Sequence, residues 1–159
     1  MLDVRQPPRM RPFARRGDTV LRSPTITIQV GSLRGVDPLP ADGSILLAFD
    51  ANLRIEIDDR VWFEEPDFPV LELAVAVYAW RRSGGSLHFD SMEASESPFL
   101  TIERLNDDCR LYAAWQSYTE SRLIPGSGVD AAFSKFADGV FQGVHSQFGV
   151  DAWRLVDGP

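Results

Sequence analysis

The segment SLHFDSMEASESPFLTIERLNDDCRLYAAWQ, residues 86–116, decides the fold class, because apolar and polar side chains alternate along three separate runs of it. A period of two is typical of strands that bury one face and expose the other. It predicts three strands, at about 86–92, 99–105 and 109–118. Asn106 and Asp107 both tolerate a positive φ, so they predict a two-residue hairpin turn between the last two strands.

This turn sets the register of the predicted strands. It places Glu103 opposite Arg110 and Thr101 opposite Tyr112, whereas a shift of one residue would mix buried and exposed faces. Across the loop EASESP, residues 93–98, we expect three further pairs: His88 with Glu103, Asp90 with Thr101, and Met92 with Phe99. The segment therefore predicts one polar surface, away from any covering helix, with the row His88–Glu103–Arg110 at its centre.

The rest of the chain supplies further strands and two helices. Residues 25–30, TITIQV, alternate and predict a strand. ILLAFD and LRIEID flank Ala51 and Asn52, which we interpret as a hairpin turn, and VWFEE predicts a short strand ended by Pro66. Two longer apolar segments, residues 67–85 and Val129–Phe148, predict helices. We therefore expect an α+β fold, a mostly antiparallel sheet of about six strands with two helices packed on one face.

The second helix carries its own start, stop and packing signals. Ser127 and Asp130, three residues apart, resemble a capping box at its start, and Gly149 suits its C-terminal end. Gly139 and Gly143 lie four residues apart inside it. Because each glycine costs about 1 kcal/mol relative to alanine, this pair predicts close packing against a neighbouring element.

Charge divides the chain into two parts. Residues 1–23 contain repeated proline and arginine with no apolar period, so we expect a flexible arm there and a single α+β domain over residues 24–159. The net charge is −7, although residues 1–22 carry six arginines against two aspartates. The acidic body repels phosphate backbones, which argues against nucleic acid, and it attracts a basic protein partner.

Other classes of protein are excluded by what the sequence lacks. No apolar run approaches the roughly 18 residues of a membrane span, and no apolar segment follows the N-terminal arginines, as a secretory signal requires. The single cysteine, Cys109, excludes an intramolecular disulfide and a zinc site built on paired cysteines. A cytoplasmic location fits these features.

The polar residues of the opening segment raise the question of catalysis. A metal site needs at least three converging ligands, and the second histidine, His145, falls on a helix that we place on the opposite side. His88, Asp90 and Glu103 could act as acid–base groups, but an open sheet face gives little shielding to shift a pKa. No nucleophile elbow and no phosphate-binding glycine loop is present, so no cofactor is expected.

A protein-binding surface remains, since tyrosine and arginine among charged residues are typical of interfaces. The candidate partner-binding residues are His88, Asp90, Met92, Glu93, Glu96, Phe99, Glu103, Arg110, Tyr112, Gln116 and Tyr118.

Three stretches, FPVLELAVAVYAW, LHFDSMEASESPFLTIERL and CRLYAAWQ, together resemble small bacterial α+β domains of unknown function. The shared pattern is a Glu-Leu-Ala helix ending in tryptophan, a strand with phenylalanine, methionine and glutamate, and a strand ending in Trp-Gln, over residues 60–118. Such domains resemble the immunity proteins of polymorphic toxin systems. The resemblance implies a protein that binds and blocks a cognate toxin without catalysis, and the acidic body predicts that this toxin is basic.

Two alternatives stay open beside this hypothesis. One is a small enzyme that uses His88, Asp90 and Glu103 as acid–base groups in a concave pocket. The other is a structural homodimer formed through the same surface, so that the free protein is either a monomer or a dimer.

Overall fold

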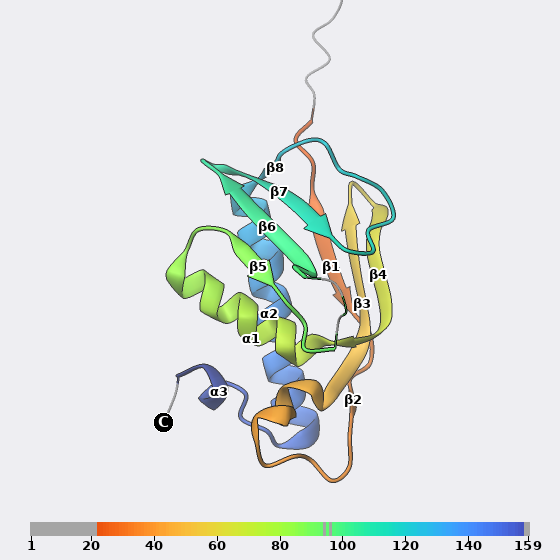
Figure 1. The fold of residues 1–159 in the computed structure, drawn as a ribbon, viewed down its shortest axis with the longest axis vertical. Coiled ribbons are helices and arrows are strands. Elements are labelled where there is room, and N and C mark those ends of the chain that lie inside the picture. The colour runs from red at the N-terminus through yellow and green to blue at the C-terminus, as the bar shows by residue number, and fades with distance from the viewer. Residues whose placement is uncertain (1–21, 94, 96, 158–159) are drawn as a thin grey trace, which may run out of the picture.

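The computed structural model describes residues 22–93, 95 and 97–157. The arm, residues 1–23, therefore lies outside the described residues except for Arg22 and Ser23. The predicted α+β class is confirmed: the described chain contains eight strands, all paired antiparallel, and two long helices packed against them (Figure 1). The strands form two sheets of four, where a single sheet of about six was expected.

The first sheet is built around its longest inner strand. It consists of β1 (Ile26–Val30), β2 (Arg34–Gly35), β3 (Phe49–Ile57) and β4 (Arg60–Pro69). β3 pairs with β1 and β2 along one side and with β4 along the other. Every second residue of β3, from Phe49 to Ile57, is buried, as the alternation of LRIEID predicts.

The turn that joins the two long strands lies later in the chain than predicted. Ala51 and Asn52 do not form a hairpin turn, because both lie inside β3, where Ala51 is fully buried and a bulge follows it. Asp58 and Asp59 form the turn instead, with φ values of 50° and 61°. Consecutive positive φ values match the twist of paired strands, and aspartate tolerates them better than most residues.

Two further boundaries differ from the sequence prediction. Residues 43–47 form a 3₁₀ turn, capped by the Asp42 carboxylate on the Ser44 amide, so the strand predicted over ILLAFD begins only at Phe49. β4 continues through Pro66 to Pro69 rather than ending at Pro66. Because β4 pairs only with β3 among the described strands, the missing N–H of Pro66 need not break the ladder.

The second sheet contains β5 (Leu87–Phe89), β6 (Leu100–Leu105), β7 (Asp108–Ala113) and β8 (Ile124–Pro125), in that order. The predicted register of β6 and β7 is confirmed, with Glu103 opposite Arg110, Thr101 opposite Tyr112, and Asn106 in the turn at a φ of 57°. The predicted register of β5 is wrong by two residues, because His88 pairs with Thr101. β5 is only three residues long, so the connection between β5 and β6 is longer than the predicted loop, residues 93–98.

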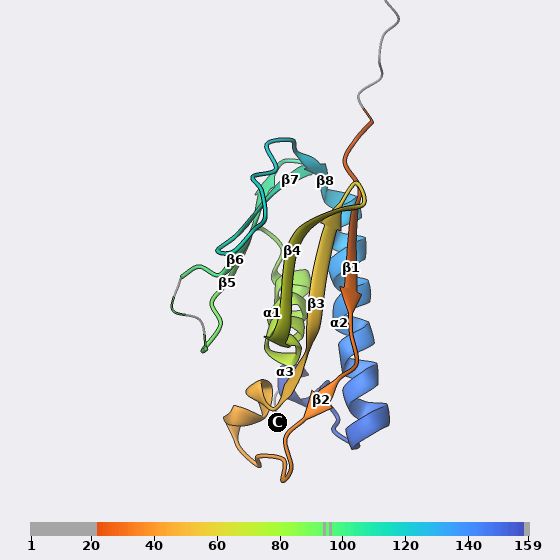
Figure 2. The same cartoon turned by 90° about the vertical axis from the view of Figure 1, so that its right-hand side faces the viewer.

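Two helices lie against the sheets. The first, α1 (Val70–Ser83), packs on β3 of the first sheet and on β5 of the second, which explains why it is apolar on nearly every side (Figure 2). The second, α2 (Gly126–Phe148), packs on α1, β1, β7 and β8. A short α3 (Arg154–Asp157) follows. None of the helices in the described part of the chain is long and apolar enough to span a lipid bilayer.

Of the two predicted end signals of α2, the structure confirms one. Gly149 adopts the left-handed conformation at the C-terminal end, as expected. No side chain from the described part of the chain caps the start, so the predicted capping box of Ser127 and Asp130 does not form. The Asp130 carboxylate binds the Arg104 guanidinium instead, while the Gly126 amide donates to the Asp107 carbonyl at 2.8 Å.

Candidate partner-binding surface

The outer side of the second sheet carries the polar residues that the alternation placed there. His88, Arg110 and Tyr112 are exposed, and Thr101 and Glu103 are partly exposed; we call these five residues the open face. Their neighbours along each strand, Leu87, Phe89, Leu100, Ile102, Leu111 and Ala113, are buried. The predicted separation into a covered and an uncovered layer is confirmed for these three strands.

The arrangement within the open face differs from the predicted row. Thr101 lies between His88 and Tyr112, and Glu103 lies one row further on, opposite Arg110. A carboxylate oxygen of Glu103 is 3.6 Å from Nη1 of Arg110, with about half of each side chain exposed. The row His88–Glu103–Arg110 does not form, so the register does not bring His88 and Glu103 together as an acid–base pair.

Phe99 is the clearest correction among the candidate residues. It was expected on the open face beside Thr101, but its side chain is only 2 % exposed. Its ring lies 5.8 Å from that of Phe63 and 5.7 Å from that of Phe68, both on β4. Phe99 precedes the first residue of β6, where alternation no longer fixes the side chain, and burial against these aromatic rings stabilises it inside.

Trp115 is the opposite case. Alternation along the strand predicted at 109–118 puts it on the same side as Ala113, in the covered layer, yet half of its surface is exposed. β7 ends at Ala113, so Trp115 lies in the following turn, where its ring meets the Phe99 ring edge-on at 5.1 Å.

The loop after β5 holds three further candidates. Met92 is 61 % exposed, and Asp90 and Glu93 are exposed as well. The Ser97 hydroxyl donates to the Asp90 carboxylate, which ties the two ends of the loop together. Glu96, the fourth candidate of this loop, lies outside the described residues.

Gln116 and Tyr118 do not join the open face. The Gln116 side-chain oxygen accepts from the Ala113 amide at 3.0 Å, so it stabilises the turn after β7. The Tyr118 ring lies under the Arg60 guanidinium, 3.8 Å from the ring centroid, and burial raises the pKa of its hydroxyl. Both residues are half-buried and hold the segment after β7 in place.

An ion-pair cluster fixes the same segment. Arg122 donates to the Glu120 carboxylate at 2.8 Å and also lies 2.9 Å from the Asp58 carboxylate in the β3–β4 turn. The hydrogen bond from Arg122 lowers the pKa of Glu120, which is only 7 % exposed. The backbone N–H of Thr25 is the main cause of the lowered pKa of Asp58, with Arg122 contributing. This cluster joins the start of β1, the β3–β4 turn and the segment before β8.

Sequence reasoning missed Glu72, one of the two buried acidic residues in the described part of the chain. It lies in the first turn of α1, is 7 % exposed, and accepts from the Ser91 hydroxyl and the Met92 amide at 2.8 Å each. A carboxylate within an otherwise apolar helix was the available signal. Glu72 anchors the loop that carries Met92 and Glu93 to the helix.

A small cleft opens beside this loop, between β4 and the turn after β7. Phe68, Phe99 and Trp115 form its apolar part, and Glu65, Asp67 and Glu93 also line it; we call it the aromatic cleft. Its volume is about 170 Å³. The strand register could not predict it, because its walls come from elements of different sheets.

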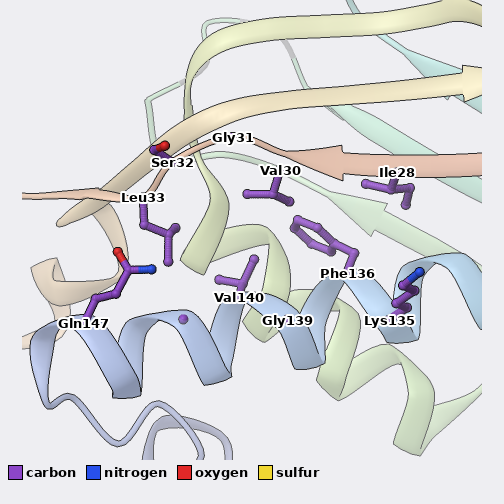
Figure 3. Close-up of a pocket in the computed structure, with 11 residues that line it drawn as sticks. Ile28, Val30, Gly31, Ser32, Leu33, Lys135, Phe136, Gly139, Val140 and Gln147 are labelled. Carbon is purple, nitrogen blue, oxygen red and sulfur yellow. The ribbon is translucent and has the colours of Figure 1, made fainter.

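A second hollow runs between β1 and α2 (Figure 3). Ile28, Val30 and Leu33 face Phe136 and Val140 across it. The predicted glycine packing holds at one of two positions: a Cβ on Gly143 would lie 2.6 Å from Cδ1 of Leu33, whereas a Cβ on Gly139 would meet nothing within 4 Å. Among the residues that the structure describes, no carboxylate or histidine lines this β1–α2 groove, so it offers no acid–base chemistry.

The described residues contain no group of three or more histidine, cysteine or acidic side chains placed to hold a metal ion. Cys109 is fully buried, and desolvation raises the pKa of its thiol.

The fold and the surface therefore define an α+β domain with two antiparallel sheets and a mixed aromatic and acidic surface. Residues 39–145 match the family model described as Domain of unknown function (DUF7878), and the chain belongs to this family. The resemblance to small domains of unknown function is thus confirmed at the level of the family. No curated protein and no solved structure matches the chain.

Proposed function

We propose that the protein is a non-catalytic protein-binding domain whose partner is a basic protein, and that it acts as an immunity protein that neutralises a toxin. The acidic body, with a net charge of −7 for the chain, speeds and orients the approach of a basic partner. The family has no assigned activity, so the proposal rests on the surface of this chain.

One observation carries the proposal: three large apolar side chains are exposed at the same end of the second sheet. Met92, Tyr112 and Trp115 are 61 %, 49 % and 50 % exposed. Along the chain, Met92 follows Phe89 by three residues, Tyr112 precedes Ala113 and Trp115 follows it by two. Phe89 and Ala113 belong to the last row of the sheet, Phe89–Leu100–Ala113. Tyrosine and tryptophan are the residue types most enriched where interfaces gain their binding energy.

The acid–base alternative gains no support from the arrangement of the same surface. His88 pairs with Thr101, and neither His88 nor Glu103 lines the aromatic cleft or the β1–α2 groove. The Glu103 carboxylate lies 3.6 Å from Arg110 with about half of its side chain open to solvent, so it lacks the enclosed, apolar surroundings that a general acid needs.

Co-expression with toxins encoded beside the gene tests the proposal. We expect a stable complex that restores growth, and we expect Tyr112→Ala combined with Trp115→Ala to weaken it by about tenfold or more. Leu155→Ala, at another exposed apolar residue in α3, is the matched control and should leave binding unchanged. If no such toxin is bound and toxicity is unaffected, the proposal is wrong.

Light scattering at micromolar concentration measures the mass of the protein in solution and so distinguishes a homodimer from a monomer that binds a foreign partner. A stable dimer that Tyr112→Ala dissociates would assign the open face to self-association instead of to a foreign partner.

A further inference from the structure

The aromatic cleft is lined by both aromatic and acidic side chains. Phe68 and Phe99 are buried, 3 % and 2 % exposed, and their rings lie 5.7 Å apart, so they form a rigid floor. Trp115 forms a wall with half of its surface open to solvent. At about 170 Å³ the cleft is smaller than the roughly 300–1,000 Å³ of pockets for drug-sized ligands, so a single side chain suits it better than a metabolite.

The charges around the cleft are incompletely paired. Asp67 forms an ion pair with Arg34, at 2.6 Å. No hydrogen bond or ion pair joins the side-chain carboxylate of Glu65 or of Glu93 to another residue in the described part of the chain. Two carboxylates thus stay available among the residues that line the aromatic cleft, and they repel an anion and attract a cation.

The cleft is also held in position before any partner arrives. The edge-on contact with Phe99 orients the Trp115 ring. Glu72 fixes the neighbouring loop through Ser91 and Met92, and this loop carries Glu93. A preformed site loses less conformational entropy on binding than one that must be ordered first.

We propose that the aromatic cleft receives an arginine side chain of the basic protein partner, an inference that rests on the proposed function for the source of that arginine. The guanidinium stacks on the exposed face of Trp115, the aromatic side chain that binds cations best. Its N–H groups donate to Glu65 and Glu93, and its aliphatic stem packs on Phe68 and Phe99. Arginine fits better than lysine because the guanidinium is planar, stacks on aromatic rings and gives up hydration more readily.

A peptide titration of the full-length protein tests the chemistry of the cleft. The probe is N-acetyl-Gly-Arg-Gly-amide, and the readout is the indole N–H resonance of Trp115, assigned with Trp115→Phe. We expect this resonance to shift and saturate with the arginine peptide. We expect no saturating shift with the same peptide carrying citrulline, which has nearly the same shape but no charge.

Two double variants distinguish binding by the carboxylates of the cleft from attraction by the net negative charge of the protein. Glu65→Gln with Glu93→Gln should weaken peptide binding by about tenfold, because both charged acceptors are lost. Glu64→Gln with Asp138→Asn removes the same charge elsewhere; Glu64 lies next to Glu65 but faces Arg54, and Asp138 lies on α2, where it pairs with Arg81. This control pair should bind the peptide within about twofold of the unchanged protein.

Three outcomes overturn the inference: an unmoved Trp115 resonance, an equal shift with the citrulline peptide, or unchanged binding by the Glu65/Glu93 variant. The same variant, tested against a bound toxin, distinguishes the two proposals. If the toxin binds it as tightly as before, the inference fails and the proposed function stands. If the peptide results hold but no toxin is bound, the cleft chemistry stands and the immunity role fails.

Discussion

Oε1 of Glu72, in the first turn of α1, lies 2.8 Å from the backbone nitrogen of Met92, twenty residues later in the chain. The other carboxylate oxygen accepts from the Ser91 hydroxyl, so both oxygens of this buried group have partners. An acidic side chain suits this position because the first turn of a helix is the positive end of its dipole. The contact joins the first helix to the loop that borders the aromatic cleft.

We expect Glu72→Ala to destabilise the protein by about 1–3 kcal/mol, since the Met92 amide and the Ser91 hydroxyl both lose their acceptor in a partly buried setting. Glu72→Gln retains one acceptor oxygen and should cost less. Urea denaturation of the three proteins checks the order. Equal midpoints for Glu72→Ala and the unchanged protein would show that the loop needs no anchor.

Acid should weaken the cluster of Asp58, Glu120 and Arg122. Folding lowers the pKa values of both carboxyls from their ordinary values, 3.8 for Asp58 and 4.5 for Glu120. At a pH between the lowered and the ordinary values, the folded protein therefore binds fewer protons than the unfolded chain. Their contribution to the free energy of unfolding is therefore fully present above those values and is lost as the pH falls through the lowered ones.

Arg122→Gln isolates this contribution. The variant should be less stable near neutral pH, and the difference from the unchanged protein should shrink as the pH falls from about 5 to about 3. Burial raises the pKa of Asp50, which acts in the opposite direction, but Asp50 is present in both proteins and cancels in the difference. A difference that stays constant over this range would contradict the linkage. Denaturant titrations at a series of pH values measure it.

The two glycines inside α2 should respond differently to alanine. Gly139→Ala should stabilise the protein by up to about 1 kcal/mol, because alanine favours the helix and the new methyl group meets open space. Gly143→Ala gains the same propensity but must displace the end of the Leu33 side chain from 2.6 Å, so it should be the less stable variant. Thermal unfolding of both variants decides the order, and the reverse order would contradict the packing described between Gly143 and Leu33.

The ion pair on the open face should contribute little to stability. Glu103 and Arg110 are about half exposed and 3.6 Å apart, so a double-mutant cycle to alanine should give a coupling below about 0.5 kcal/mol. The pair of Arg104 and Asp130 should couple more strongly, because the Arg104 side chain is more buried and lies over the Trp80 ring. Equal coupling free energies in the two cycles would contradict the prediction that the more buried pair contributes more to stability.

The sequence predicted best where one short turn fixed the geometry. The hairpin at Asn106 set the pairing of Glu103 with Arg110 and of Thr101 with Tyr112, because a turn of two residues leaves one register that keeps the faces separate. The longer connection before β6 leaves several registers, and the prediction for His88 was wrong by two residues. A shift of two preserves the face of each side chain, so its exposure was still predicted correctly.

Two kinds of feature could not be predicted from local pattern. The aromatic cleft combines Phe68 of the first sheet with Phe99 and Trp115, which lie just outside strands of the second sheet, and no spacing along the chain encodes how two sheets meet. Sequence alternation also failed at strand ends, where Phe99 turned inward and Trp115 outward. The hydrogen-bond partners of Glu72, Ser91 and Met92, lie in a loop, and the periodicity of a helix does not predict contacts with a loop.

The packing of α2 on β1 bears on how the chain folds during synthesis. Among the described strands β1 is synthesised first, and the helix that faces Ile28 and Val30 follows about 100 residues later. At typical elongation rates of about 5–20 residues per second, the ribosome needs roughly 5–20 s to supply it. During that interval the nascent chain exposes a β-branched segment to other polypeptides, so elongation speed and chaperone supply should govern how much protein escapes aggregation.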